Sequence, residues 1–410
     1  MTKPFAQNGH NEVTAAFGIE TTWRQSARPN PCTTDPESRK KQNEEASRAD
    51  TVFWDQMERE WGFSLKRLEE FYEEFGTPRA VREARKASQP PPAGSWPGWY
   101  EPRDMITMAL GGDEPQWING SLWHDRSRHA LDRVESADDM NRLAVPDWPS
   151  VPAVQRMLAA RDQWQAAHPE EPPSGLGTAY DLTIPGRPLA HSINYPSFVD
   201  LGVFLMGMTR FLTILAGEPE LADAFLDKCF AMSTGYVDFL LSLKPEKFEA
   251  LCGFGGDTTC MLSPSLYPRY GAAWDVRLFD HVRQTHQTPD DLPCNLHSCG
   301  PSAHLYGLWG QHPRRRNVTT VQTRLLPGKV RELRQNLPDT QLELTIALPH
   351  FDAAKAAPDA LKKLLLESAR DAANRDLHLV IVMAAHRPED LQQVTRNAAA
   401  CREAMEQIRR

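Results

Sequence analysis

The chain has 410 residues, of which 40% are hydrophobic and 24% are charged, and its formal net charge is −8. This length exceeds what one small core needs, and the composition is typical of a soluble globular protein. The acidic balance gives no reason to expect nucleic acid as a partner, because contacts to phosphates require a basic face. The densest basic cluster, three arginines at residues 314–316, is interpreted as a solvated loop.

The seven cysteines are odd in number and scattered along the chain, mostly in apolar segments. This pattern is typical of a reduced intracellular protein and not of a disulfide scaffold. Residues 1–9 lack the apolar core of a signal peptide. The longest apolar stretch, residues 201–215, contains Arg210 and is shorter than the ~20 residues that a membrane span needs. We therefore expect a cytoplasmic protein without membrane contact.

The first hundred residues are expected to form a mostly helical N-terminal extension, followed by a catalytic domain at residues 101–410. Residues 1–45 are rich in proline and polar side chains and are predicted to be irregular. Residues 51–75 repeat apolar side chains at helical spacing, which predicts a pair of amphipathic helices. Residues 89–97, QPPPAGSWP, indicate a linker. The roles considered for this extension are a lid and a homodimer contact.

From about residue 130 onward, helices and strand-like runs follow one another in a regular order. The first of them are a helix at 150–168, a strand at 176–184, and helices at 199–216 and 218–243. Further strands are predicted at 248–254, 293–296, 318–322, 341–348 and 378–383. The helices that follow them are predicted at 264–286, 301–309, 328–335, 357–374 and 388–408.

Strands that alternate with helices of about ten or more residues predict βαβ units and a parallel sheet. No Gly-x-Gly-x-x-Gly follows the first strand, so a Rossmann domain is not indicated. The length and the number of units favour an α/β fold of the (β/α)8 type, a TIM barrel.

Side chains capable of chemistry follow four of the predicted strands at their carboxyl ends. In chain order they are Asp257, His297 with Cys299, His350 and His386. In a TIM barrel these ends meet at the face that carries the active site. Imidazole and thiolate are ligands that zinc favours, and catalytic zinc sites combine three protein ligands with one open position. The sequence therefore predicts a mononuclear zinc site at this face.

His297 and Cys299 are two residues apart at a strand end, so their side chains point to the same side. The predicted ligands are these two and His386, with Asp257 or His350 as a fourth ligand or as a group that orients a histidine. Each of the last three has a structural alternative. His350 could be a surface loop residue, His386 an exposed residue before a helix, and Asp257 part of an ordinary Gly-Gly-Asp turn.

Three further polar side chains are candidates for contact with a small-molecule substrate. Tyr180 lies in the predicted strand 176–184, and Asn194 and Tyr195 lie in the loop that follows. We expect these residues, together with His350, to face the substrate. For Asp257 we expect catalytic work as an acid or base, or the orientation of a metal ligand.

Three sequence blocks resemble the uroporphyrinogen decarboxylase-like superfamily, especially its corrinoid-dependent, zinc-containing methyltransferases. Residues 256–267 contain GD followed by LSPSLY, similar to the family's "GD…ISPe.f/y" block. Residues 296–300, LHSCG, resemble its "H-x-C-G" zinc motif. The third block is the last strand and helix, after Ala384, and the paired helices of 199–243 resemble the family's middle region. The resemblance covers residues 130–410.

The resemblance implies a barrel whose zinc activates a thiol or accepts a leaving group. It implies transfer of a methyl group to or from the cobalt of a corrinoid, which is usually carried on a separate small protein. His297 and Cys299 match the family's zinc motif. The family's third ligand is a cysteine in a "P-G-C-G" context, whereas residues 384–386 here read AAH, so His386 would replace it. This exchange makes the site less negative by one charge, which would suit an anionic acceptor or water.

Two alternatives remain beside the methyltransferase. The first is the metal-free decarboxylase itself, because residues 23–29, WRQSARP, share part of its "R-Q-A-G-R-Y" motif. The second is a non-catalytic relative that binds a corrinoid or a partner protein. One bound zinc speaks against the decarboxylase, and a corrinoid absorbance change on adding a methyl donor distinguishes an enzyme from a binding module.

Overall fold

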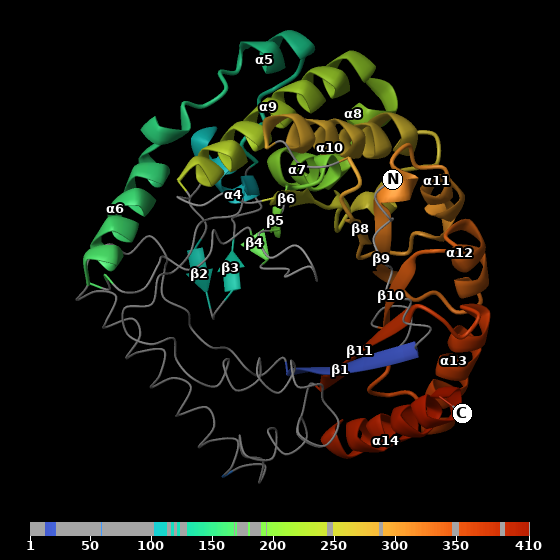
Figure 1. The fold of residues 1–410 in the computed structure, drawn as a ribbon. Coiled ribbons are helices and arrows are strands. Elements are labelled where there is room, and N and C mark those ends of the chain that lie inside the picture. The colour runs from blue at the N-terminus through green and yellow to red at the C-terminus, as the bar shows by residue number, and fades with distance from the viewer. Residues whose placement is uncertain are drawn as a thin grey trace, which may run out of the picture.

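The structure of the protein is a computed structural model. Helices and strands alternate over most of the described chain (Figure 1). The described residues are 13–21, 59, 102–112, 116–118, 121–123, 129–167, 169, 179–180, 190–193, 195–243, 249–286, 290–346, 352–385 and 390–409. The predicted α/β class is confirmed. Of the predicted helix pair at 51–75, only residue 59 is described, and it is helical.

The main sheet has six strands in the order β1-β11-β10-β9-β8-β7, and every neighbouring pair is parallel. The strands are β1 (Val13–Thr21), β7 (Phe254–Gly255), β8 (Cys294–Ser298), β9 (Val318–Arg324), β10 (Gln341–Ile346) and β11 (Leu377–Ala385). Because all strands run the same way, their carboxyl ends lie along one edge of the sheet. The predicted parallel sheet is therefore confirmed.

A second sheet has three strands, and its last strand is followed in sequence, after Gly253 alone, by β7 of the main sheet. Its members are β4 (Ala179–Tyr180), β5 (Ala190–Ile193) and β6 (Glu249–Cys252). β5 is parallel to β6, and β4 is antiparallel to β5. Only Gly253 separates β6 from β7 of the main sheet. Within the described strands nothing pairs β1 with β4 or β5, so the sheet is open, and a closed eight-stranded barrel is not confirmed.

Five helices lie along the outer side of the arc of strands (Figure 1). They are α10 (Ala273–Thr285), α11 (Tyr306–Gly310), α12 (Val330–Asn336), α13 (Pro358–Asp371) and α14 (Asp390–Arg409). Alternate residues of the strands, such as Leu342, Leu344 and Ile346 of β10, are buried. The half-exposed residues between them lie on the opposite face of the sheet.

A second group of helices packs beside the strands and shares an aromatic cluster with α10 and the residues just before it. It comprises α4 (Pro102–Ala109), α5 (Ala137–Arg142), α6 (Pro152–Ala167), α7 (Phe198–Met206), α8 (Met208–Gly217) and α9 (Pro219–Ser242). The ring of Phe198 lies 5.4–5.8 Å from the rings of Phe211, Phe225, Tyr270 and Trp274. Burial of these rings anchors α7, whose first turn faces the candidate site.

The helix predicted at 199–216 is two helices that meet at Gly207 with a bend of 119°. Gly207 has a φ of +79°, a conformation that glycine adopts without the strain a Cβ would cause. No single described helix is long and apolar enough to cross a membrane, and α7 with α8 meets that criterion only as this bent pair.

The prediction of an irregular segment at 1–45 is wrong for residues 13–21, which form β1. This strand pairs with β11 from Val13 opposite Leu377 to Thr21 opposite Ala385. A pairing partner so distant in the chain leaves no local signal in the sequence. The expected boundary at residue 100 stays a prediction, although one strand of the main sheet comes from the segment before it.

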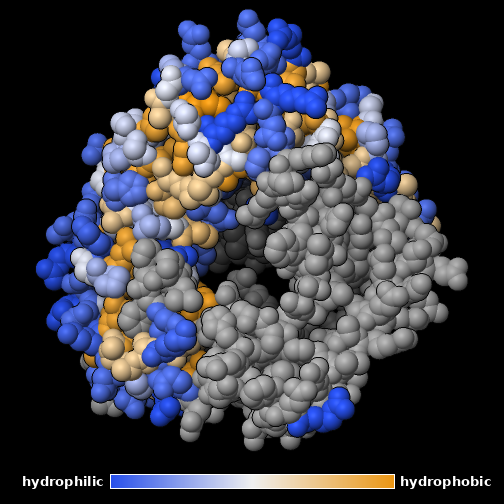
Figure 2. Space-filling view, turned by 180° about the vertical axis from the view of Figure 1, so that it is seen from behind, coloured by the Kyte–Doolittle hydropathy of each residue, from blue (hydrophilic) through white to orange (hydrophobic). Residues whose placement is uncertain are grey.

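The described surface is mostly hydrophilic, with apolar side chains showing between the charged ones (Figure 2). The arginines at 314–316, interpreted as a solvated loop, lie between α11 and β9, where residues Arg315–Asn317 form a short 3-10 turn. Arg314 pairs with Asp280 and Asp290, and Arg316 also pairs with Asp290. The positive charges of Arg314 and Arg316 are therefore partly balanced by these two carboxylates.

Candidate metal centre

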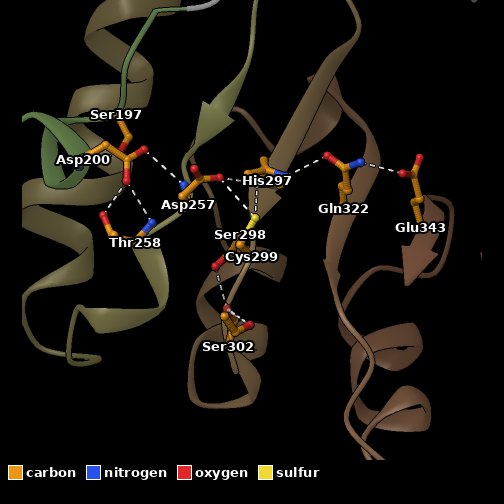
Figure 3. Close-up of polar contacts among 11 residues, drawn as sticks. Ser197, Asp200, Asp257, Thr258, His297, Ser298, Cys299, Ser302, Gln322 and Glu343 are labelled. Atoms are coloured by element: carbon orange, nitrogen blue, oxygen red, sulfur yellow. Dashed lines mark hydrogen bonds and ion pairs between the residues drawn. The ribbon is translucent and has the colours of Figure 1, made fainter. Parts of the chain in front are cut away.

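Three of the predicted site residues lie together where β7 and β8 end (Figure 3). His297 Nε2 is 2.9 Å from Asp257 Oδ1 and 3.0 Å from Cys299 Sγ. The remaining side of this triangle, from Cys299 Sγ to Asp257 Oδ1, measures 3.1 Å. We call these three residues the triad. In the part of the chain that the structure describes, it is the one group of His, Cys, Asp and Glu side chains whose ligand atoms all converge.

The turn after β7 brings Asp257 to the triad through close backbone contact with β8. Gly255 has a φ of +70°, and a Cβ there would lie 2.4 Å from the carbonyl oxygen of His297. That oxygen accepts a hydrogen bond of 3.0 Å from the N–H of Gly256. The Gly255 N–H donates to the buried carboxylate of Asp275 on α10 at 3.0 Å. Only glycine fits this turn, so the Gly-Gly-Asp sequence positions the carboxylate.

Asp200, on the first turn of α7, holds the same turn from the other side. Its Oδ2 accepts the backbone N–H of Asp257 at 3.1 Å, and its Oδ1 accepts that of Thr258 at 2.9 Å. The N–H of Asp200 donates in turn to the N-cap residue Ser197, whose Oγ lies 3.0 Å away. The Ser-x-x-Asp spacing marks a helix start. Nothing in the sequence links it to a turn 57 residues later, so Asp200 was not predicted.

Replacing Asp200 with asparagine should destabilise the fold by about 1–3 kcal/mol, because an amide NH2 would face a backbone N–H that has lost its acceptor. Urea unfolding of the purified variant measures this change. The control is Asp223→Asn, which removes one carboxylate from an exposed ion pair with Arg269 and should change stability by less than about 1 kcal/mol. Equal effects of the two substitutions would contradict the role of Asp200.

Two further side chains extend the triad across the sheet (Figure 3). His297 Nδ1 lies 2.7 Å from Gln322 Oε1, and Gln322 Nε2 lies 2.5 Å from Glu343 Oε1. Neither Gln322 nor Glu343 was predicted as a site residue. The signal available in the sequence was the position of a charged residue inside an apolar strand, where a partner is normally required.

The contacts within the triad shift the pKa values of His297 and Asp257. Partial burial disfavours a charged imidazole, but hydrogen bonds to Asp257 and Cys299 outweigh it and raise the pKa of His297 to about 10. The hydrogen bond from His297 lowers the pKa of Asp257 to about 2, although partial burial opposes this change. Without a metal, the site at neutral pH therefore contains an imidazolium and a carboxylate.

These shifts predict how the metal-free protein responds to pH. The raised pKa of His297 contributes stability that is complete below pH 6.5 and is lost as the pH rises through about 10. The lowered pKa of Asp257 contributes stability that is present above pH 3.8 and is lost as the pH falls through about 2. In an NMR titration of chelator-treated protein, the His297 ring signals should not move between pH 6 and 8. A midpoint near 6.5 would contradict this expectation, and Asp257→Asn should lower the midpoint.

The donor set of the triad fits zinc. An imidazole nitrogen, a thiol sulfur and a carboxylate oxygen are all established zinc ligands. Bonds of 2.0–2.3 Å in a tetrahedral arrangement separate ligand atoms by about 3.5 Å. The observed separations of 2.9–3.1 Å reach this value with shifts of a few tenths of an ångström. The side chain of Cys299 is exposed, which leaves one side open to a substrate.

Cys260 lies against the backbone of the His-x-Cys-Gly motif and is not part of the triad. A Cβ on Gly300 would lie 2.0 Å from Cys260 Sγ, so this sulfur packs against the backbone of the motif. Burial raises the pKa of the Cys260 thiol. Gly300 is therefore required by the close approach of Cys260.

The other predicted site residues are not joined to the triad by the described structure. Asn194, His350 and His386 lie outside the described residues, so the roles given to them stay predictions. Tyr180 lies in β4. Tyr195 is only 5% exposed and belongs to the hydrophobic core beside α7. Contact of either tyrosine with a substrate also stays a prediction.

Comparison with known proteins identifies no family for this chain. No protein-family model and no curated protein matches the sequence. Among solved structures, a methyltransferase from Methanosarcina mazei aligns at 12% identity with a TM-score of 0.42. The alignment covers 73% of this chain and 77% of that protein. Similarity at this level carries no conclusion about activity.

Proposed function

We propose that the protein is a zinc-dependent methyltransferase. It would move a methyl group between a corrinoid cofactor and a small thiol or methylated heteroatom substrate. The observation that supports this most is the triad, in which the His-x-Cys pair and Asp257 converge to within 3.1 Å. The resemblance of residues 256–267 and 296–300 to the corrinoid-dependent zinc methyltransferases supplies the reaction class.

In this proposal His297 Nε2, Cys299 Sγ and Asp257 Oδ1 hold the metal, and His386 remains the expected further ligand. Zinc, when bound, keeps a coordinated thiol as a thiolate near neutral pH and thereby makes it a nucleophile. The protein's own residues position the ligands. Asp200 fixes the backbone of Asp257, and the exposed side of Cys299 admits the substrate.

The remaining parts of the proposal rest on the resemblance of the sequence blocks. These are the corrinoid, the separate protein that carries it, and the closure of the strands into a (β/α)8 barrel. A cytoplasmic location, a small-molecule substrate and a homodimer contact through the first hundred residues complete the proposal.

The test is loss of the methyl–cobalt bond in the presence of a thiol. Purified protein is mixed with methylcobalamin and a panel of small thiols, and the corrinoid absorbance is followed. We expect a change with the wild type that Cys299→Ser loses and that His304→Gln, an exposed histidine bonded to the carbonyl of Leu262, retains. Decarboxylation of uroporphyrinogen by the wild type, with no corrinoid change, would overturn the proposal in favour of the metal-free decarboxylase.

A further inference from the structure

A row of polar side chains crosses the sheet beside the triad. His297 of β8 is paired in register with Gln322 of β9, and Gln322 is paired with Glu343 of β10. Residues paired in register on neighbouring parallel strands present their side chains to the same face. Glu343 is in turn paired with His378 of β11. The row therefore starts at the proposed zinc ligand His297, is hydrogen-bonded as far as Glu343, and continues in register to β11.

The hydrogen bonds along this row have a defined direction. The Nε2 amide group of Gln322 can only donate hydrogen bonds, and it donates one to Glu343 Oε1, 2.5 Å away. This contact fixes the orientation of the amide, which places its Oε1 toward His297. That oxygen can only accept, so the nitrogen 2.7 Å from it, His297 Nδ1, carries the proton.

We propose that Gln322 and Glu343 are positioning residues that select Nε2 of His297 as the metal ligand. With Nδ1 protonated and engaged, the lone pair of a neutral ring lies on Nε2, which faces Asp257 and Cys299. The negative charge of Glu343 also polarises the amide and makes Gln322 Oε1 a stronger acceptor. This inference rests on the metal site of the proposed function, and it concerns residues that the zinc motif itself does not contain.

Zinc affinity, measured by competition with a chromogenic chelator, gives the first test, and it needs no methyl donor. Loss of an outer hydrogen-bond partner weakens metal binding by about 10–100-fold. We expect Gln322→Leu near the upper end of this range and Glu343→Gln near the lower end. The control Glu332→Gln removes the same charge from an exposed ion pair with Lys329 and should leave affinity unchanged.

A double variant separates positioning from simple destabilisation. In Gln322→Glu with Glu343→Gln, the new carboxylate accepts from His297 Nδ1–H directly, and the new amide donates to that carboxylate. The direction of the row and its net charge are both preserved, so zinc affinity should return to within a few-fold of the wild type. Affinity that stays as low as in Gln322→Leu would overturn the proposal, as would an unchanged affinity in Gln322→Leu.

The Nδ1–H proton gives a readout that does not depend on metal. In protein labelled with 15N-histidine, the wild type should show a slowly exchanging Nδ1–H signal for His297, with or without zinc, and Gln322→Leu should lose it. A wild type that binds no zinc but shows this signal overturns the proposed function and not the hydrogen-bond row. A wild type that binds zinc without a protected Nδ1–H overturns the row and leaves the proposed function standing.

Discussion

Replacing Cys299 with serine should abolish stoichiometric zinc binding. A serine hydroxyl stays protonated near neutral pH and is a poor substitute for a thiolate ligand. Loss of an outer hydrogen-bond partner already weakens metal binding by about 10–100-fold, so loss of a direct ligand should cost more than ~100-fold. Metal analysis of the purified variant should fall from about one zinc per chain to near zero, and His297→Ala should behave in the same way.

The matched control for this experiment is Cys401→Ala. Cys401 is fully buried on α14, and its substitution removes one sulfur from the chain without touching the triad. This variant should keep one zinc per chain even if its stability falls slightly. Retention of zinc by Cys299→Ser, or its loss in Cys401→Ala without unfolding, would show that the metal is not held by the triad.

Replacing Gly255 with alanine should destabilise the protein by roughly 3 kcal/mol and weaken metal binding as well. A residue with a Cβ at positive φ costs ~1–3 kcal/mol. At Gly255 the Cβ would also lie 2.4 Å from the carbonyl oxygen of His297, which is backbone and cannot rotate away. Relief of this contact requires β7 and β8 to separate, and that movement carries Asp257 away from Cys299. Urea unfolding and zinc competition measure the two effects.

Alanine substitutions at two other glycines separate the backbone strain of a positive φ from the close contact between β7 and β8. Gly111 has a φ of +80° with no atom within 4 Å of a Cβ, so Gly111→Ala should show the backbone strain alone, about 1 kcal/mol. Gly217 ends α8 with open space and no positive φ, and Gly217→Ala should change stability by less than about 0.5 kcal/mol. If Gly255→Ala lowers the free energy of unfolding by no more than Gly111→Ala does, the close contact between β7 and β8 adds nothing to the destabilisation.

The sequence predicted the elements near the site well because their signals are local. The strands at 293–296 and 318–322 were found close to their positions, as β8 and β9, and each is followed by a helix as expected. β8 extends two residues further than predicted, to Ser298, so His297 lies inside the strand. That extension matters, because it gives His297 the register position opposite Gln322.

The partners of the supporting residues could not be predicted, because these contacts depend on the folded arrangement. Gln322 and Glu343 join His297 only through the register of three strands, and Asp200 reaches Asp257 only because α7 packs beside the turn after β7. The strand β1 was missed for the same reason, since its partner β11 is at the other end of the chain. The His-x-Cys pair needed no such information, since two residues of one strand end share a side.

Diffraction data collected on either side of the zinc absorption edge would test the metal site most directly. We predict one anomalous peak per chain, at bonding distance from His297 Nε2 and Cys299 Sγ and adjacent to Asp257 Oδ1. Protein purified without chelator and crystallised without added metal is the proper sample. A map without a peak at the triad, or with its only zinc peak elsewhere, would contradict the account.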